Sequence, residues 1–256
     1  MKTVILCGGK GTRMKEETEF KPKPLVEIGG KPILWHIMKI YAYYGFNEFI
    51  LALGYKGDMI KDYFLKSKYF SSDFTLHTAS HSIDFHADAH DDFKITFVDT
   101  GLESLTGERM RRVKKYIPEE EFMVTYGDGV GDVDLKKMLE FHRAQGTIAT
   151  LTGVRPRSRF GLMKINEEKS LASGFSQKPQ LEEYVSGGFM VFKKQAFDYF
   201  DDGWLENAFV KLTAEKQLSI YKHDGFWKAM DTYNEMEELN ALWNEQRPWA
   251  VWERKA

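Results

Sequence analysis

Short runs of consecutive apolar residues alternate with amphipathic stretches through the first third of the chain. Residues 3–7 and 49–54 are continuous apolar runs that end in glycine-containing segments, a pattern typical of strands buried on both faces of a parallel sheet. The stretch from Pro32 to about Gly45 predicts a helix with proline in its first turn and glycine as its C-cap, and residues 58–65 predict a second helix. This order of strand, helix, strand and helix predicts a doubly wound α/β fold.

The same alternation continues to the end of the chain, with one region that fits it poorly. Residues 95–98, 122–125 and 149–152 predict strands, residues 135–145 an amphipathic helix, residues 160–192 short β segments, and helices resume near Glu206 and Tyr233. We find no internal repeat and no linker, so we expect residues 1–256 to form a single domain. The poorly fitting region is 70–92.

Composition narrows the class of protein. With 256 residues, 43% of them hydrophobic, the chain can bury a full core without disulfides. Six residues before the first glycines are too few for a signal peptide, no stretch reaches membrane-spanning length, and Cys7 has no partner for a disulfide, so we expect a cytoplasmic protein with no membrane partner. The net charge of −2 and the lack of long basic runs argue against nucleic acid, although small anionic ligands stay possible.

The segment Leu6-Cys7-Gly8-Gly9-Lys10-Gly11-Thr12-Arg13 carries the strongest chemical signal. A strand that opens into glycines lets backbone N–H groups approach phosphate oxygens, because no Cβ stands in the way. The segment lacks the Gly-Lys-Ser/Thr of a P-loop, and Met14 stands where a dinucleotide-binding motif has its third glycine. Arg13, Lys21 and Lys23 add cations suited to a diphosphate, which favours phosphate binding over a tight turn with ordinary surface cations.

Two aspartates are candidates for holding a metal. Asp128 follows a predicted buried strand in Tyr126-Gly127-Asp128-Gly129, at the end of the sheet where α/β proteins bind ligands. A carboxylate there can hold Mg²⁺, although an Asp-Gly turn alone is common. Asp231, taken by itself, reads better as the N-cap of the helix that begins near Tyr233.

These motifs resemble those of the sugar-phosphate nucleotidyltransferases, whose opening motif is Gly-Gly-x-Gly-Thr-Arg with a lysine about ten residues later. The resemblance implies that the glycines cradle a triphosphate, Arg13 holds the departing pyrophosphate and Lys23 contacts the reacting phosphates. It also implies a Rossmann-like mixed sheet with a smaller β-rich part that binds the sugar. The residues then expected to bind the nucleotide are Leu6, Gly8, Gly9, Gly11, Thr12, Arg13, Lys23, Ser104, Arg109 and Gly127. For Arg109 the alternative is a solvated side chain, because Arg109, Arg111 and Arg112 open a helix and two of the three should face water.

The resemblance extends to the metal and the sugar phosphate. It implies that Asp128 and Asp231 bind Mg²⁺ and that Lys178, in Ser176-Gln177-Lys178-Pro179, binds the sugar phosphate. The family has glutamate where this chain has Gln177 and asparagine where it has Ser186, so the identity of the sugar is open. The residues expected on the sugar-phosphate side are Lys178, Gln177, Gly161 and Ser186, and those expected to act in catalysis are Arg13, Lys23 and Asp128.

Further segments resemble the branch of this family that joins CTP to glucose 1-phosphate. They are residues 26–38, 54–57, 98–101, 125–129, 187–189, 242–243 and 248–249. The resemblance implies a nucleotide-binding part at about 1–130, a sugar-phosphate-binding part at about 131–256, small-molecule substrates and assembly into a homo-oligomer. The alternatives are another nucleoside triphosphate or phosphorylated acceptor, or a homologue that binds nucleotide without turnover. The last would usually lack an arginine, lysine or metal carboxylate that this chain retains.

The histidines of the poorly fitting region allow two interpretations. His77, His81, His86 and His90 form two pairs spaced four residues apart among several aspartates, which suggests a transition-metal site. The alternative, which we favour, is a polar insertion that covers the active site or contacts a neighbouring subunit.

Overall fold

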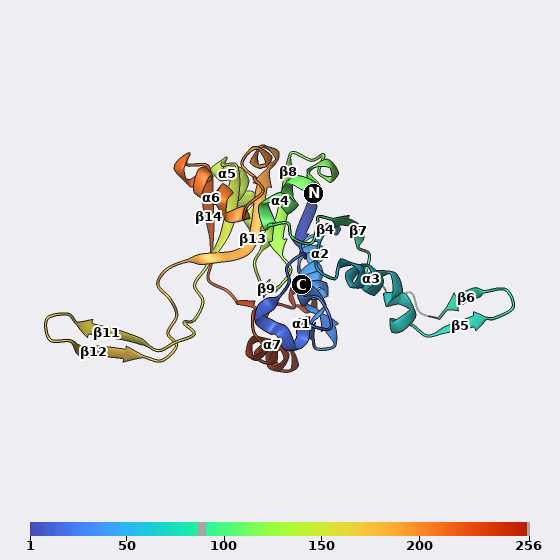
Figure 1. Cartoon of the computed structure of the whole chain (residues 1–256), viewed down its shortest axis with the longest axis horizontal. Coiled ribbons are helices and arrows are strands. Elements are labelled where there is room, and N and C mark those ends of the chain that lie inside the picture. The colour runs from blue at the N-terminus through green and yellow to red at the C-terminus, as the bar shows by residue number, and fades with distance from the viewer. Residues whose placement is uncertain (87–90, 255–256) are drawn as a thin grey trace.

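A central mixed β-sheet organises the computed structural model, which describes residues 1–86 and 91–254 (Figure 1). Within these residues, seven strands form the sheet in the order β14-β10-β13-β8-β1-β4-β7. All neighbours are parallel except that β13 runs antiparallel to both β8 and β10. The strands are β1 Lys2–Leu6, β4 Glu48–Leu53, β7 Lys94–Asp99, β8 Glu121–Tyr126, β10 Ala149–Val154, β13 Val185–Lys193 and β14 Leu218–His223. The predicted doubly wound fold is confirmed.

Helices cover both faces of this sheet. Consecutive β1 side chains show the reason, because Ile5 joins the core on one face while Val4 and Leu6 join the core on the other. Helices α2, α3, α5 and α7 contribute to the first core, and α4 and α6 contribute to the second. Their bounds are α2 Ile33–Tyr43, α3 Gly57–Ser71, α4 Thr106–Val113, α5 Leu135–Gln145, α6 Leu205–Ala214 and α7 Tyr233–Glu245, and a one-turn α1 spans Lys15–Thr18.

The first helices differ in detail from the sequence prediction. Pro32 is the N-cap residue of α2 and does not lie in its first turn, and Tyr44 is the C-cap, so Gly45 lies one residue beyond it with a φ of 90°. Helix α3 extends to Ser71 and takes in residues that the prediction left in the poorly fitting region. In both cases the helix itself was predicted correctly and only its boundary was wrong.

Two hairpins extend from the body in opposite directions (Figure 1). One pairs β5 Phe74–His77 with β6 Ser82–Phe85, and the other pairs β11 Leu162–Asn166 with β12 Leu171–Ser176. Two short strand pairs complete the β structure of the described residues: β2 Glu27–Ile28 with β3 Lys31–Pro32, and β9 Gly129–Gly131 with β15 Trp227–Ala229.

Two of the histidines have side-chain partners within or beside the β5–β6 hairpin. His77 pairs with Asp84 across the hairpin at 2.8 Å, and His86 Nε2 lies 2.9 Å from the Thr75 hydroxyl. No group of three potential metal ligands occurs among the described residues, which do not include Asp88 and His90. The hairpin strands expose both polar and apolar side chains, and a role over the active site or against a neighbouring subunit stays a prediction.

Candidate active site

The candidate site lies where the carboxyl ends of β1 and β8 meet. Strands β4 and β7 lie on one side of β1, and the next strand in the sequence, β8, lies on its other side. The position between β1 and β8 is therefore a topological switch point. Open α/β sheets bind ligands at such a point because the loops diverge there and leave a crevice. Leu6 ends β1 at this crevice and Tyr126 ends β8.

The glycine loop after β1 takes a shape that side chains would obstruct. Gly11 has a φ of 62°, and a Cβ there would lie 2.7 Å from Thr18 Cγ2. Gly8 makes room for Arg109, whose Cζ would lie 2.2 Å from an added Cβ. Gly9 has no heavy atom within 4 Å of such a Cβ and is exposed, so its backbone stays open to a ligand. Of the three glycines, Gly9 thus has the backbone most open to a ligand, and phosphate binding by the loop stays a prediction.

A cleft of about 470 Å³ opens over this loop. All ten residues predicted to bind the nucleotide line it, from Leu6 in β1 to Gly127 after β8. Its far wall comes from residues 102–106, before and at the start of α4, and from Trp204 and Glu206 at the start of α6. A polar floor under a partly apolar wall suits a nucleotide, whose phosphates and base need different surroundings.

Arg109 lines this cleft, but its guanidinium is hydrogen-bonded to backbone carbonyls of the protein. The residue is only 4% exposed, while Arg111 and Arg112 face solvent as predicted. Arg109 Nη1 donates to the carbonyl groups of Leu53 (3.0 Å) and Gly101 (2.9 Å), and Nη2 donates to that of Gly8 (3.0 Å). It thereby ties the glycine loop to the loops that follow β4 and β7.

A short antiparallel ribbon brings Asp128 and Asp231 together. Strands β9 and β15 pair from Gly129 to Gly131, and the Met230 amide donates to the Asp128 carbonyl at 2.8 Å. Both aspartates therefore sit at the same end of one ribbon. Asp231 is not the N-cap of α7, because Thr232 caps the helix in a capping box with Glu235. The Asp231 carboxylate is free to face the cleft.

Three cations converge on these two carboxylates. Lys23 Nζ donates to Asp128 Oδ2 at 2.6 Å and to Asp231 Oδ1 at 2.8 Å, and Arg13 Nη1 donates to Asp231 Oδ2 at 2.9 Å. Arg159 Nη2 lies 3.7 Å from the same Oδ2. Burial alone would raise the pKa of Asp231, but the hydrogen bond from Lys23 and the surrounding positive charge hold it below its usual range.

The donor set fits a hard divalent cation. Asp128 and Asp231 both contact one ammonium nitrogen, so their oxygens already face a single cation-sized position. Mg²⁺ typically takes one or two carboxylates and completes its shell with water and phosphate oxygens. The number and type of these ligands therefore suit Mg²⁺ bound together with a phosphorylated substrate.

A second cleft of about 220 Å³ adjoins the first and shares Arg13, Tyr126 and Asp128 with it. Ser186 lines this cleft, as predicted for the sugar side, together with Gly187, Gly188, Trp227 and Asp231. Two clefts that meet at Asp128 allow two ligands to bind with their near ends at the same carboxylate.

The remaining predicted sugar-phosphate residues lie away from both clefts. Gln177 and Lys178 are exposed at the end of the β11–β12 hairpin, close to Gly161 at its beginning. The charge of Lys178 helps to lower the pKa of Glu238 on α7, although the hydrogen bond from Lys228 to Glu238 is the larger cause. The structure thus groups these residues with one another but does not bring them to Asp128.

Sequence reasoning missed Arg159. Arg159 lies in the segment that precedes β11, and its guanidinium donates to Glu235 Oε1 at 2.7 Å. This hydrogen bond connects that segment to the start of α7. The signal was present in Arg155-Pro156-Arg157-Ser158-Arg159, where three arginines alternate beside Gly161. Nothing in that pattern could show that Arg159, and not Arg155 or Arg157, reaches Asp231.

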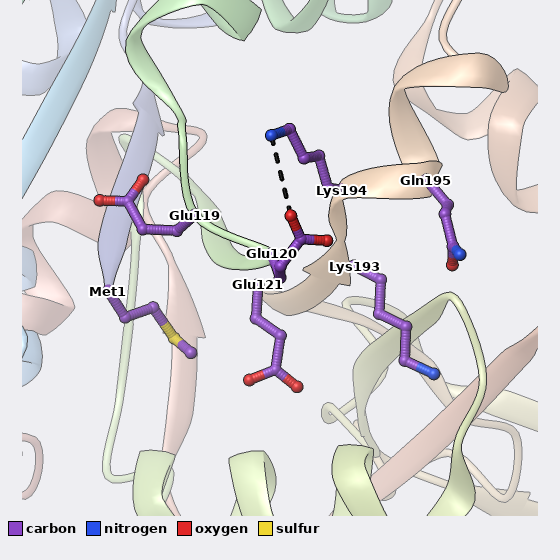
Figure 2. A pocket seen from close by; sticks show the side chains of 7 residues that line it. All are labelled: Met1, Glu119, Glu120, Glu121, Lys193, Lys194 and Gln195. Carbon is purple, nitrogen blue, oxygen red and sulfur yellow. Dashed lines mark ion pairs between the residues drawn. The ribbon is translucent and has the colours of Figure 1, made fainter.

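Another hollow, at the amino ends of the strands, has no comparable set of groups (Figure 2). Its residues are Met1, Glu119, Glu120, Glu121, Lys193, Lys194 and Gln195. Glu121 is paired with Arg143 outside the hollow, Lys194 pairs with Glu120, and Lys193 binds a backbone carbonyl. We assign no chemistry to it, because each of these charged side chains already has a partner, mostly outside the hollow.

Comparison with known proteins decides the family. The model of the nucleotidyl transferase family matches residues 2–244, which is nearly the whole chain. The chain belongs to the nucleotidyl transferase family. The resemblance inferred from the glycine loop, the Gly-Asp-Gly turn and the C-terminal aspartate is therefore confirmed.

Relatives of this nucleotidyltransferase match it from end to end. A probable glucose-1-phosphate cytidylyltransferase from Bacillus subtilis (strain 168) is 45% identical over 98% of this chain and 100% of its own length. The glucose-1-phosphate cytidylyltransferase of Salmonella typhi is 43% identical over 99% of this chain and 100% of its own. A solved structure of a putative glucose-1-phosphate thymidylyltransferase from Bacillus anthracis has a TM-score of 0.70 and 16% identity, covers 96% of each chain, and supports the fold alone.

The chain also shows no helix, among those described, that is long and apolar enough to cross a membrane.

Proposed function

We propose that this nucleotidyltransferase transfers a cytidylyl group from CTP to glucose 1-phosphate, giving CDP-glucose and pyrophosphate. The observation that carries the proposal is the identity of 43–45% along full-length relatives named for this activity. Two adjoining clefts that share Asp128 support it, because the reaction must bring two phosphorylated substrates end to end. The larger cleft, over the glycine loop, would hold CTP.

The reaction needs no dedicated general base. An oxygen of the sugar phosphate attacks the α-phosphorus of CTP in line while pyrophosphate leaves on the opposite side. The attacking phosphate is mostly ionised near neutral pH, because the second pKa of a phosphate monoester is about 6. The main obstacle is repulsion between two polyanions, so catalysis consists of positioning and charge neutralisation. Lys23 would contact the reacting phosphates and Arg13 would stabilise the departing pyrophosphate.

Asp128 and Asp231 would hold Mg²⁺ between the two substrates. When bound, the ion supplies positive charge at the phosphate oxygens during the transfer. The contact of both carboxylates with the single ammonium of Lys23 supports this assignment.

Lys178 would bind the sugar phosphate, with Gln177, Gly161 and Ser186 on the same side of the substrate. This role requires the segment around Lys178 to approach the second cleft when the sugar phosphate binds. Arg159 supports such an approach, since it already connects the beginning of that segment to Asp231.

A substrate screen tests the proposed function. All four nucleoside triphosphates would be combined with a panel of sugar 1-phosphates and with Mg²⁺, and pyrophosphate release would be measured. We expect the highest kcat/KM for CTP with glucose 1-phosphate. A higher value for another pair would replace these substrates but keep the reaction, and no release with any pair would favour a nucleotide-binding protein without turnover.

The assembly and location of the protein form the remaining part of the proposal. We propose a cytoplasmic homo-oligomer in which residues 1–130 bind the nucleotide and residues 131–256 bind the sugar phosphate within one domain. Support for assembly comes from apolar side chains that the β11–β12 hairpin exposes, namely Leu162, Met163, Ile165, Leu171 and Phe175. Light scattering coupled to size-exclusion chromatography would give the number of copies.

A further inference from the structure

The site contains a side-chain cation at the position expected for the metal. Lys23 donates to both Asp128 and Asp231, and its side chain is only 12% exposed, so its ammonium lies between the carboxylates and is well shielded from water. Without a cation between them, these two carboxylates would repel each other. Lys23 removes that repulsion without any ligand.

The surrounding charges disfavour a metal that arrives alone. Arg13 and Arg159 both face Asp231 Oδ2, so three side-chain cations face two carboxylates. A divalent ion that entered without an anion would have to displace Lys23 from the carboxylates. The ammonium of Lys23 would then lie next to the metal charge, with no carboxylate to accept its hydrogen bonds. Each of these groups therefore opposes the binding of a free metal ion.

A bound polyphosphate changes this balance. Lys23 and Arg13 line the larger cleft beside the glycine loop, so both can turn from the aspartates to phosphate oxygens there. The exchange leaves each cation with an anionic partner and frees both carboxylates for the metal. Ligands that each improve the site for the other are coupled, and such coupling is reciprocal.

We infer that Lys23 competes with the metal for the position between Asp128 and Asp231 and makes metal binding depend on the nucleotide. The inference rests on the proposed roles of Asp128 and Asp231. It predicts that removing the ammonium of Lys23 has opposite effects on two ligands. Metal alone should bind more tightly, whereas nucleotide, which loses a cation, should bind more weakly.

Calorimetric titration with Mn²⁺ alone, without any nucleotide, tests this. We compare the wild-type protein with Lys23→Met and with the control Lys21→Met, a lysine two residues away that pairs with Glu17 and Glu27 and does not contact the aspartates. Coupling between sites is typically about 5- to 150-fold, so we expect Lys23→Met to bind Mn²⁺ at least about fivefold more tightly and Lys21→Met to match the wild type. A gain below fivefold, or an equal gain in the control, overturns the inference.

Two further variants keep the result interpretable. Lys23→Gln, which is neutral but can still donate to one carboxylate, replaces Lys23→Met if circular dichroism shows that the latter does not fold. The double variant Lys23→Met, Asp231→Asn must lose the gain, and if it keeps it the metal binds elsewhere and the inference is wrong. Because no nucleotide is present, an error in the assignment of CTP leaves this experiment unaffected. Conversely, if the wild-type enzyme is active on CTP but Lys23→Met shows no gain in Mn²⁺ affinity, only the inference about Lys23 is refuted.

Discussion

Replacing Arg109 by lysine should destabilise the protein much more than the same change at a neighbouring arginine. The guanidinium makes four hydrogen bonds of 3.0 Å or less, to the carbonyls of Leu53, Gly101 and Gly8 and to the Thr100 hydroxyl at 2.6 Å. A lysine ammonium is a compact donor and cannot reach the two sides of this planar arrangement together. At least two of these four hydrogen bonds to the charged guanidinium would therefore be lost.

The magnitude follows from those lost bonds. A hydrogen bond to a charged group contributes about 1.5–3 kcal/mol, so the loss of two costs roughly 3–5 kcal/mol after partial relaxation. For a chain of this length each kcal/mol lowers the melting temperature by roughly 2–4 °C, which predicts a decrease of about 6–20 °C for Arg109→Lys. Differential scanning fluorimetry and urea unfolding measure the change.

Arg112→Lys is the matched control. Arg112 lies on the same helix with a half-exposed side chain that pairs with Glu108 and donates to the Thr100 carbonyl. Exposed pairs contribute about 0–1 kcal/mol, so the change should lower the melting temperature by less than about 4 °C. If Arg109→Lys costs as little as Arg112→Lys while nucleotide binding is lost, Arg109 contacts the nucleotide and does not hold the loops together.

The remaining predictions concern the reaction and the response to acid. Asp128→Asn should lower kcat roughly a hundredfold or more with the fold intact, because it removes charge that neutralises the reacting phosphates, and a kcat near the wild-type value would remove Asp128 from the site. Arg13→Ala should lower mainly kcat, and Lys178→Ala should raise the KM for glucose 1-phosphate roughly ten- to hundredfold. Kinetics with each substrate varied in turn test both. If Lys178→Ala weakened only the nucleotide and Arg13→Ala only the sugar phosphate, our orientation of the substrates would be wrong. Gln177→Glu should change which sugar phosphate is preferred and leave the preference for the nucleotide unchanged. KM values for a panel of sugar phosphates and nucleotides test this, and a change confined to the nucleotides would contradict it. Burial alone would raise the pKa of Asp132, but hydrogen bonds to its carboxylate lower that pKa to about 2. The stability that the ionised carboxylate contributes is therefore complete above about pH 4 and is lost as the pH falls toward 2. Urea unfolding between pH 4 and pH 2 should show a smaller loss of stability for Asp132→Asn than for the wild type.

Apolar patterning predicted the sheet and its helices because burial on two faces leaves a clear trace in sequence. The run before Gly8 and the run before Asp128 became β1 and β8, the two strands that border the site. Their glycines, cations and acidic turn could then be placed together from general rules of α/β folds. The association of Asp128 with Asp231 came from family resemblance, because local sequence favoured Asp231 as a helix cap.

What the sequence could not predict depends on contacts between distant residues. Helical spacing distinguishes Arg109 from its solvated neighbours only once it is known which side of α4 faces the sheet. Arg159 reaches Asp231 because a segment from the middle of the chain passes beside α7. The position of Lys23 between two carboxylates requires three segments to be placed correctly at once.

The β9–β15 ribbon has a consequence for how this protein tolerates change. The separation of Asp128 and Asp231 is set by main-chain pairing, and the neighbouring side chains of Lys228 and Ala229 take no part in it. Substitutions at those two positions should leave the spacing of the aspartates unchanged. Inserting or deleting one residue between Ala229 and Asp231 would turn the Asp231 side chain to the opposite face of the ribbon. The spacing of the two aspartates therefore constrains the length of this ribbon more than the identity of the residues at positions 228 and 229.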